Sequence, residues 1–455
     1  MMNWLELAKK YEETYVHIVK ELLQIPTVLE KYEPDNIEEP FGKGIREALD
    51  YMLKLGENDG FKVKNIDNYA AHIEMGKGKE VLGVLGHLDV VPAGGKWNQP
   101  PFSAYEEDGK IYARGAMDDK GPTVAAYIAF KMIKDQGIKL NKKVRLILGC
   151  DEESGMRGIK RYLEKEQMPD LGFAPDAEFP LIYAEKGIYA FTYHGKVTDK
   201  LILSIEAGDR FNVVPDQCEV ALSENRDKEF TKFLKDNKIQ GEILGNHKYV
   251  VYGKNAHAAW PNLGVNEISL MVKFLIKLTN NPLINMLDQY LTDDHLGKKL
   301  GIQVYDKEMD DLTLNLAFTH FNGKEVEIGV NIRYPKNYDF NEGEKRIIKA
   351  GKEFALNYQF NSNSKPHYVS PDDPLVKELH QAYIKYTNDT ESKIMSIGGG
   401  TYSRMLKKAV AFGPALPGDE DLAHQPNEYL KINDMITAIA IYAEGIVRLA
   451  GESCD

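Results

Sequence analysis

Histidine and acidic side chains follow apolar segments at several places along this chain of 455 residues. The clearest case is VLGVLGHLDV, in which an apolar run starting at Val81 leads into His87 and Asp89. An apolar run without polar alternation predicts a strand buried on both faces, as in a parallel sheet. Buried polar groups need partners, and residues i and i+2 of an extended segment share a face. One of the two side chains could therefore hold a metal while the other holds the first in place.

Four further groups of the same kind come after predicted strands or in the turns that follow them. They are Asp118 and Asp119 in GAMDDKG, Asp151 with Glu152 and Glu153 after KVRLILGC, Asp176 with Glu178, and His424 in LAHQPNE. Carboxylates gathered at one sheet edge repel each other unless a cation neutralises them, and mixed histidine and carboxylate ligands suit zinc, manganese or cobalt. More carboxylates are present than one cation needs, which predicts two metals about 3.5–4 Å apart sharing a carboxylate and activating a water. A glutamate that binds no metal could then be the general base.

Each motif taken alone has an ordinary interpretation. A single HxD is usually a pair of unrelated surface or core residues, and adjacent glutamates are usually solvated. GAMDDKG could be a turn before a helix, where the helix dipole favours acids. The succession of all these groups, each after a predicted strand, favours a site.

The elements that would position these groups alternate between strands and helices in the first part of the chain. We expect a helix from Asn3 to about Leu23, a second over Lys43–Asn58, and helices over 122–136 and 156–166, with strands over 63–75, 81–89 and 143–150. This alternation predicts an α/β fold with a mostly parallel sheet and right-handed crossovers.

The pattern changes near residue 184 and returns near residue 369. Between them, strand-like segments such as 189–194, 201–205, 249–252, 312–318 and 325–333 alternate with helices near 230–237, 265–280 and 342–356. We therefore expect residues 1–184 and 369–455 to form one catalytic domain. Residues 185–368 are expected to form an inserted α+β lid domain, which is a full domain in size.

Composition limits the classes of function. The formal net charge of −12 argues against a nucleic-acid or anionic-membrane partner. The three cysteines, Cys150, Cys218 and Cys454, lack CxxC spacing and fit reduced thiols in a cytoplasmic protein. We expect no signal peptide, and we find no apolar run of about 18 residues that would span a membrane.

The motifs GHLDVVP, RGAMDDKGP, DEES, PDAEFP and AHQPNE together resemble those of the M20 metallopeptidase family. Within that family the chain resembles the PepV-type bacterial dipeptidases. The resemblance extends over essentially the whole chain, including GGGTYSR and the inserted domain.

The resemblance implies a role for each matching residue. It implies a first metal held by His87 and Asp176, with Asp89 orienting His87. A second metal would be held by Glu153 and His424. Asp118 would bridge the two metals through its carboxylate, and the Asp118–Asp119 peptide bond would be cis. Glu152 would be the general base. The cofactors implied are two divalent ions, with zinc favoured over manganese and cobalt.

The resemblance also implies substrate contacts. His257 would stabilise the oxyanion, Asn212 and Arg333 would bind the substrate carboxylate, and Arg404 with Gly399 of the 398–401 loop would complete the pocket. From the residues alone, these would be an ordinary loop histidine, turn asparagine, strand-edge arginine and tight turn. A long insert of this type implies that His257 acts within its own chain, as a monomer.

The leading interpretation is a metal-dependent dipeptidase acting on unblocked dipeptides, with a small peptide as its partner. An N-acyl amino acid deacylase of the same family would share the metal residues, and a non-catalytic binding protein is a third alternative, which the intact Glu152 and ligand set disfavour. A dipeptidase needs an acid for the substrate ammonium, and Asp89, Asp119 and Glu178 are candidates.

Overall fold

The apolar segment VLGVLGH forms β3 (Val81–His87), in which every residue is buried. The computed structural model describes residues 2–420 and 422–452. Strand β3 lies inside a nine-stranded sheet with the order β1 (Lys62–Ile66), β2 (Ala70–Gly76), β6 (Lys143–Gly149), β3, β7 (Leu171–Ala174), β24 (Ala409–Ala411), β9 (Ile182–Glu185) and β22 (His367–Tyr368), with β23 (Met395–Ile397) also pairing with β9.

The α/β class predicted from the sequence is confirmed, but the parallel arrangement is limited to the central strands of the sheet. Parallel pairing joins the central strands β6, β3, β7 and β24. Strands β1, β2 and β9 join this group in antiparallel pairs. Parallel strands need long crossover connections, and helices make these connections between the central strands. Strands β1 and β2 are antiparallel, so a short turn joins them.

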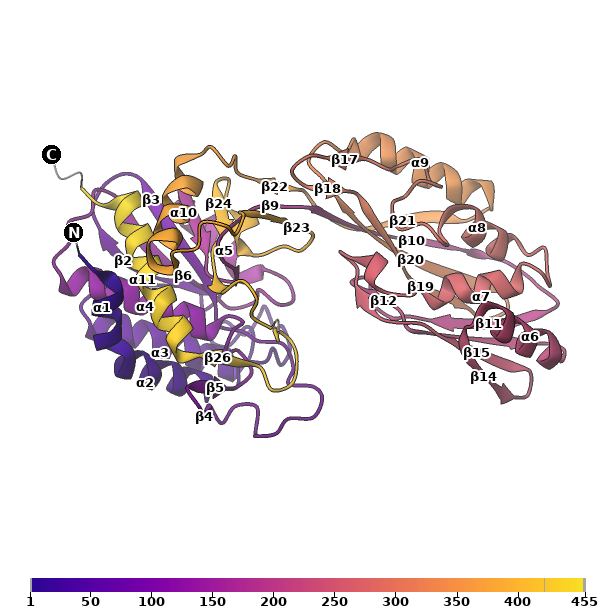
Figure 1. Ribbon diagram of the computed structural model, residues 1–455, viewed down its shortest axis with the longest axis horizontal. Helices are drawn as coiled ribbons and strands as arrows, with labels where there is room; N and C mark the ends of the chain where they lie inside the picture. The colour runs from indigo at the N-terminus through magenta and orange to yellow at the C-terminus, as the bar shows by residue number, and fades with distance from the viewer. Residues whose placement is uncertain (1, 421, 453–455) are drawn as a thin grey trace. The chain divides into compact units, whose positions relative to one another are not determined.

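Helices of this part of the chain pack against the sheet and against each other. They are α1 (Trp4–Ala8), α2 (Glu12–Leu23), α3 (Lys43–Asn58), α4 (Lys120–Asp135), α5 (Arg157–Lys165), α10 (Pro374–Thr387) and α11 (Ile432–Ala450), with short 3-10 turns at Lys9–Tyr11 and Tyr402–Met405. Figure 1 shows α11, in yellow, beside α4, and the two helices pack together. Most of α4 is buried, so its sequence is apolar nearly all round.

The chain divides into two compact units. The first comprises Met1–Tyr183, Tyr368–Met395 and Gly400–Asp455, and the second comprises Ala184–His367 with Ser396–Gly399. The first unit also contains a small sheet of β4 (Tyr105–Glu107), β5 (Lys110–Tyr112) and β26 (Tyr429–Lys431), and the pair β8 (Ala177–Glu178) with β25 (Pro414–Ala415).

An eight-stranded antiparallel sheet forms the second unit. Its order is β14 (Gln240–Gly245), β15 (Lys248–Tyr252), β13 (Gln217–Leu222), β11 (Ile202–Ala207), β19 (Thr313–Phe321), β20 (Glu325–Tyr334), β10 (Gly187–Lys196) and β21 (Asn357–Ser364). The unit also contains α6 (Asp227–Asn237), α7 (Glu267–Leu275), α8 (Pro282–Tyr290), α9 (Phe340–Glu353), a 3-10 turn at Pro261–Leu263, and the strand pairs β12 (Val213–Val214) with β16 (Ala256–His257) and β17 (Tyr305–Asp306) with β18 (Asp310–Asp311).

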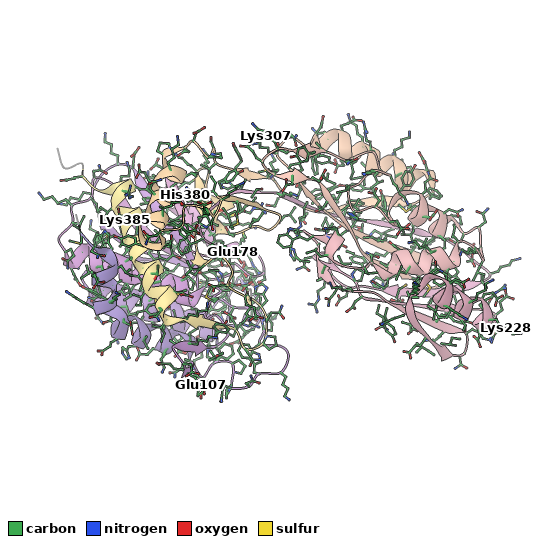
Figure 2. The ribbon with its side chains drawn as sticks, viewed as in Figure 1. Glu107, Glu178, Lys228, Lys307, His380 and Lys385 are labelled. Atoms are coloured by element: carbon green, nitrogen blue, oxygen red, sulfur yellow. The ribbon has the colours of Figure 1, made fainter. Side chains whose placement is uncertain are left out.

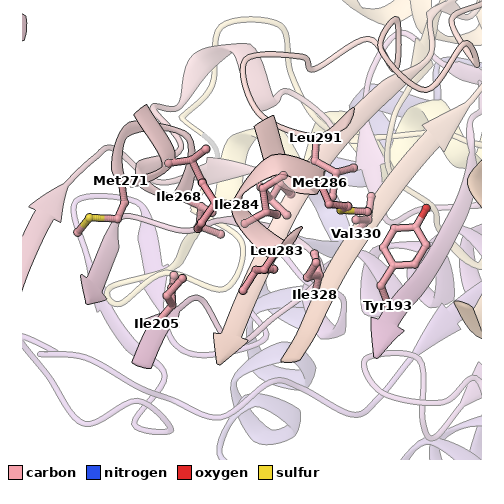
Figure 3. Packing of buried hydrophobic residues seen from close by; sticks show 14 of the residues in the cluster. Tyr193, Ile205, Ile268, Met271, Leu283, Ile284, Met286, Leu291, Ile328 and Val330 are labelled. Carbon is pink, nitrogen blue, oxygen red and sulfur yellow. The ribbon is translucent and has the colours of Figure 1, made fainter. Parts of the chain in front are cut away.

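The second unit has its own hydrophobic core. Figure 3 shows Ile268 of α7 and Leu283 of α8 among the apolar side chains of the strands, which include Ile328 and Val330 of β20. Strand β13 alternates buried and more exposed residues, as expected where one face of a sheet is covered. This core gives the unit the means to fold independently.

The segment 396–399 was expected to belong with residues 369–455, but the structure groups it with the second unit. The backbone N–H of Lys186 donates to the carbonyl of Ile397 at 2.9 Å, and Arg333 donates to the carbonyl of Gly398 at 2.9 Å. These bonds attach the segment to Lys186, which precedes β10, and to Arg333 of β20.

Charged side chains are found on the outside of both units. Figure 2 labels Glu107 in the first unit and Lys228 and Lys307 in the second, and all three are exposed. Cys150 and Cys218 are buried free thiols, whereas Cys454 lies outside the described residues. Among the described helices, none has the length and apolar character needed to cross a membrane.

A buried histidine in β2 predicts a specific acid sensitivity. His72 is 5% exposed, and burial, with the nearby charge of Arg145, lowers its pKa from 6.5 to about 4. The unfolded chain therefore binds this proton at a higher pH than the folded chain does, so the free energy of unfolding should fall as the pH drops from 6.5 to about 4. We expect His72→Gln to reduce that loss, as measured by urea unfolding of metal-free protein at about pH 7 and about pH 4.5.

The exposed histidine His17 provides the matched control. His17→Gln should leave the difference in unfolding free energy between the two pH values unchanged. An equal effect of both substitutions would contradict the role given to His72.

Candidate metal centre and active site

His87 lies at the end of β3 with its imidazole buried. Its Nδ1 is 2.9 Å from the backbone carbonyl oxygen of Asp89, so Nδ1 donates the proton and Nε2 is left as the ligand nitrogen. Nε2 is 3.0 Å from Oδ1 of Asp118 and 3.8 Å from Oδ2 of Asp176. Three of the predicted metal residues therefore meet at the carboxyl end of the central strands.

Asp118 lies between two histidines. While Oδ1 faces His87, Oδ2 is 2.9 Å from Nε2 of His424. The same Nε2 is 3.1 Å from Oε2 of Glu153. The Asp118–Asp119 peptide bond is cis, as the resemblance implied. Each carboxylate oxygen of Asp118 thus faces a different histidine, which is the arrangement that a carboxylate shared by two cations would need.

Asp118 and His424 are carried by other structural elements than we expected. Both were predicted to follow strands of the large sheet. Asp118 instead lies in the loop between β5 and α4, and His424 lies in the loop between β25 and β26. Of the five metal residues, His87 is the last residue of β3, and Glu153 and Asp176 closely follow β6 and β7 of the nine-stranded sheet.

The electrostatics of the cluster fit a cation. Burial would raise the pKa of Asp118, but hydrogen bonds to His424 and His87 hold it below its ordinary value. Hydrogen bonds to Asp118 and Glu153 raise the pKa of His424 to about 10. Within the described part of the chain, Oε1 of Glu153 is buried without a hydrogen-bond partner, and Nε2 of His87 faces carboxylate oxygens of Asp118 and Asp176. Positive charge is favoured here and a ligand atom is unused, so the residues present suit divalent metal ions.

Asp89 does not make the contact that was expected of it. Its carboxylate is 3.7 Å from Nδ1 of His87, too far for a hydrogen bond. Its two oxygens instead accept the backbone N–H groups of Glu152 at 3.0 Å and Glu153 at 3.1 Å. The strand ends at His87, so the chain turns and brings the carbonyl of Asp89, rather than its side chain, to the imidazole. The carboxylate fixes the turn that carries the two glutamates.

Glu152 is a carboxyl group that can hold a proton near neutral pH. Withdrawal from water raises its pKa to about 8, and the negative charges of Glu153 and Asp118 act in the same direction, against the lowering effect of His87. The neighbouring Asp151 accepts two hydrogen bonds from Arg157, at 2.6 Å and 2.9 Å. This ion pair anchors the turn at Asp151.

The other candidate acids are placed differently. Asp119 is buried, and its Oδ2 accepts hydrogen bonds from the backbone of His87 at 3.1 Å and from Thr123 at 2.9 Å. This close approach needs glycine at position 86, where a Cβ atom would lie 2.1 Å from Oγ1 of Thr123. Glu178, labelled in Figure 2, is exposed in β8.

The predicted substrate residues of the second unit form two groups. Asn212 and His257 are exposed on adjoining segments, since Val213 pairs with His257 and the carbonyl of Asn212 accepts the N–H of Ala258 at 2.9 Å. Arg333 is 4% exposed and is held by Asn331 at 2.9 Å and by the carbonyl of Gly398.

The glycine loop runs across the boundary between the units. Gly398 and Gly399 group with the second unit, and a Cβ atom at Gly398 would lie 2.6 Å from Cβ of Ala259. Arg404 belongs to the first unit, where its guanidinium lies against Gly400. The loop therefore has a glycine where another segment approaches its backbone closely.

Two residues near the cluster were not singled out from the sequence. Glu428 and Arg114 form an ion pair at 2.6 Å with both side chains almost fully buried. Each lies within a quoted motif, AHQPNE and RGAMDDKGP, but no feature of the motifs indicates that they pair. The available signal in the sequence was a charge of each sign within the motifs that carry Asp118 and His424.

An α/β unit that gathers histidines and carboxylates at the carboxyl end of its strands defines a metal-dependent hydrolase. The chain belongs to peptidase family M20/M25/M40, whose sequence model matches residues 83–448.

Similar proteins extend over the whole chain. It is 39% identical over 469 residues to a "Putative dipeptidase" of Staphylococcus epidermidis, covering 99% of this chain and 100% of that protein. It is 40% identical over 470 residues to "Putative dipeptidase YtjP" of Bacillus subtilis, with the same coverage. Human carnosine dipeptidase 1 has a similar fold, with a TM-score of 0.63, 15% identity and 98% of each chain covered. Aminoacylhistidine dipeptidase from Vibrio alginolyticus has a TM-score of 0.57, 13% identity and 96% of each chain covered.

The position of Asp118 predicts how metal binding should respond to its removal. If the carboxylate is shared, Asp118→Ala removes a ligand from both ions, so binding of both should weaken together. Equilibrium dialysis against Zn²⁺ or Mn²⁺ should give about two ions per chain for the unchanged protein and a marked loss for the variant. The exposed Glu107→Gln should retain the unchanged stoichiometry. Retention of both ions by Asp118→Ala would contradict the shared role.

Proposed function

We propose that this protein is a metal-dependent dipeptidase that hydrolyses the peptide bond of unblocked dipeptides. The observation that carries the proposal is the placement of Asp118, with one carboxylate oxygen toward His87 and the other toward His424. Membership of a peptidase family and similarity to relatives named as dipeptidases support a peptide substrate.

In this proposal two divalent ions occupy the cluster. His87 and Asp176 would hold one, Glu153 and His424 the other, and Asp118 both. Each ion then has three protein ligands, which leaves room for water and substrate. Zinc is favoured because of its preference for this donor set, and manganese or cobalt would also suit it. A pair of such ions supplies a water acidic enough to act as a nucleophile near neutral pH.

Glu152 is proposed as the general base. It would take a proton from the attacking water and deliver it to the leaving amine. Burial raises its pKa to about 8, close to neutral pH, where a carboxylate can both accept and return a proton. Asp89 supports this role by holding the backbone of the Glu152–Glu153 turn.

An N-acyl amino acid deacylase is the alternative within the family. A dipeptidase must receive a free ammonium group, which requires an acid near the reacting bond. Asp89 is engaged by backbone N–H groups through both oxygens. Asp119 has one oxygen, Oδ1, that is buried without a hydrogen-bond partner among the described residues. Because Asp119 is fully buried, a substrate ammonium does not reach this oxygen in the structure, and it is the relatives named as dipeptidases that favour a dipeptide over an acylated amino acid.

We further propose that the second unit supplies groups to the substrate. His257 would donate to the developing oxyanion, and Asn212 and Arg333 would bind the substrate carboxylate, with Gly399 and Arg404 completing the pocket. Arg333 suits this role because its planar fork accepts a carboxylate bidentately and its contacts with Asn331 and Gly398 fix its orientation. In this proposal one chain is sufficient for activity, and the buried free thiols Cys150 and Cys218 fit a cytoplasmic location.

The proposal is tested with a panel of unblocked dipeptides and N-acetyl amino acids, assayed with added Zn²⁺, Mn²⁺ or Co²⁺. We expect release of free amino acids from dipeptides only, with activity lost after chelation and restored by metal. Cleavage confined to the N-acetyl compounds would support the deacylase instead.

Glu152→Gln separates proton transfer from metal binding. The amide has nearly the same shape but cannot take up the proton, so kcat for dipeptides should fall by roughly two to four orders of magnitude. Metal content should stay close to that of the unchanged protein, because Glu152 is not proposed as a ligand. A fully active variant, or one that loses metal, would contradict the role.

His257→Ala tests the contribution of the second unit. Loss of an oxyanion donor should lower kcat by roughly two to three orders of magnitude without changing metal content. His320→Ala, on β19 of the same unit, is the matched control and should retain activity. Mixing inactive His257→Ala and Glu152→Gln proteins should restore nothing. Recovered activity would mean that the histidine is donated between chains.

A further inference from the structure

The pair Arg114–Glu428 is the most deeply buried ion pair near the cluster. Their side chains are 2% and 0% exposed, and Nη1 of Arg114 is 2.6 Å from Oε2 of Glu428. Removing two charges from water costs more than their attraction returns unless further hydrogen bonds compensate. The partners of this pair therefore indicate what it does.

Glu428 accepts backbone N–H groups from the loop that carries Asp118. Its Oε2 accepts Gly115 N–H at 3.1 Å. Its Oε1 accepts Met117 N–H at 2.8 Å and Asp118 N–H at 3.2 Å. A single carboxylate thus satisfies backbone donors along the loop up to the residue that faces both histidines.

Arg114 connects the same carboxylate to the segment that carries His424. Its Nη2 donates to the backbone carbonyl of His424 at 3.1 Å. His424 and Asn427 both have left-handed backbone conformations, with φ of 64° and 63°. Histidine and asparagine adopt this conformation more readily than most non-glycine residues, and the bond from Arg114 holds the segment at His424.

Asp118 and His424 are the two cluster residues that no strand of the nine-stranded sheet positions. Their side chains nevertheless meet at 2.9 Å. The bonds of Glu428 and Arg114 join the two loops in place of a strand ladder.

We propose that Glu428 and Arg114 are positioning residues that set the spacing of Asp118 and His424 and thereby the affinity of the metal centre. This inference rests on the proposed metal site. It assigns the pair no contact with substrate and no part in proton transfer.

The test is a titration of metal-free protein with Co²⁺, followed by visible absorption, which reports both affinity and ligand geometry. Glu428→Gln retains the size of the side chain but loses the charge that holds Arg114. It should weaken cobalt binding by roughly 10- to 100-fold, as loss of groups that orient metal ligands does, and should alter the absorption spectrum. In dipeptide assays at saturating cobalt, kcat should fall more than KM changes.

Arg114→Lys is the second variant, because it retains the positive charge beside Glu428 and loses the fork that also reaches His424. It should weaken the ion held by His424 and Glu153 more than the ion held by His87 and Asp176. The titration should therefore separate into a tighter and a weaker step.

Glu74→Gln is the matched control. Glu74 forms a partly buried ion pair with Arg145 at 2.8 Å, at the opposite end of β6 from Glu153. This substitution should lower the thermal stability of the metal-free protein while leaving cobalt affinity and spectrum unchanged.

Unchanged cobalt affinity and spectrum in both Glu428→Gln and Arg114→Lys would overturn the inference. If Glu428→Gln does not fold, the Arg114→Lys titration alone decides it. If the unchanged protein binds cobalt but cleaves no dipeptide, the proposed activity fails while this comparison stands. If it binds no cobalt, both fail.

Discussion

The constraint on which the rest of the first unit depends is the gathering of carboxylates in a site withdrawn from water. Asp118, Glu152, Glu153 and Asp176 lie at one end of the sheet beside His87 and His424. Burial, together with the charges of neighbouring acids, raises the pKa of Asp176 well above its ordinary value. Such a cluster is stable only when positive charge is supplied, by protonated histidines or by cations.

The fold meets this constraint in two ways. The parallel strands β3, β6 and β7 deliver His87, Glu153 and Asp176 to a shared edge, where the strand ladder itself fixes their spacing. Loops deliver Asp118 and His424, and hydrogen bonds to buried side chains fix them. The first arrangement follows from topology, whereas the second has to be built from individual contacts, which is why buried charged residues such as Arg114 and Glu428 surround it.

The sequence predicted the elements with strong periodicity. Helix α3 has the expected bounds, Lys43–Asn58, and the buried run after residue 81 forms β3. One helix was expected over 265–280, but α7 ends at Leu275 and a separate helix, α8, begins at Pro282 after the N-cap Asn281. Helix α8 was not predicted, and Asn281 before Pro282 was the available signal for its start. Strands β14 and β21 were missed because they are exposed edge strands, which lack an alternating apolar pattern.

The residues of the candidate site were predictable, but the hydrogen bonds between them were not. Order and residue type indicated His87, His424 and several groups of acids, and the resemblance to the M20 family was needed to select Asp118, Glu153 and Asp176 from those groups. They could not indicate that the carboxylate of Asp89 binds the Glu152–Glu153 backbone rather than His87. That choice depends on how the chain turns after β3 and where backbone N–H groups point, which side-chain patterns do not encode.

The order of segments in the first unit has a consequence for synthesis. Strand β24, which lies between β7 and β9 in the sheet, and the loop carrying His424 both come after the whole second unit in the chain. Because domains generally fold as units as the chain emerges from the ribosome, most of the second unit can form while the first still lacks one of its central strands. The histidine that faces Asp118 and Glu153 emerges later still. Until then the nascent sheet has an exposed edge. The acids at its end still lack His424, so the full cluster cannot form.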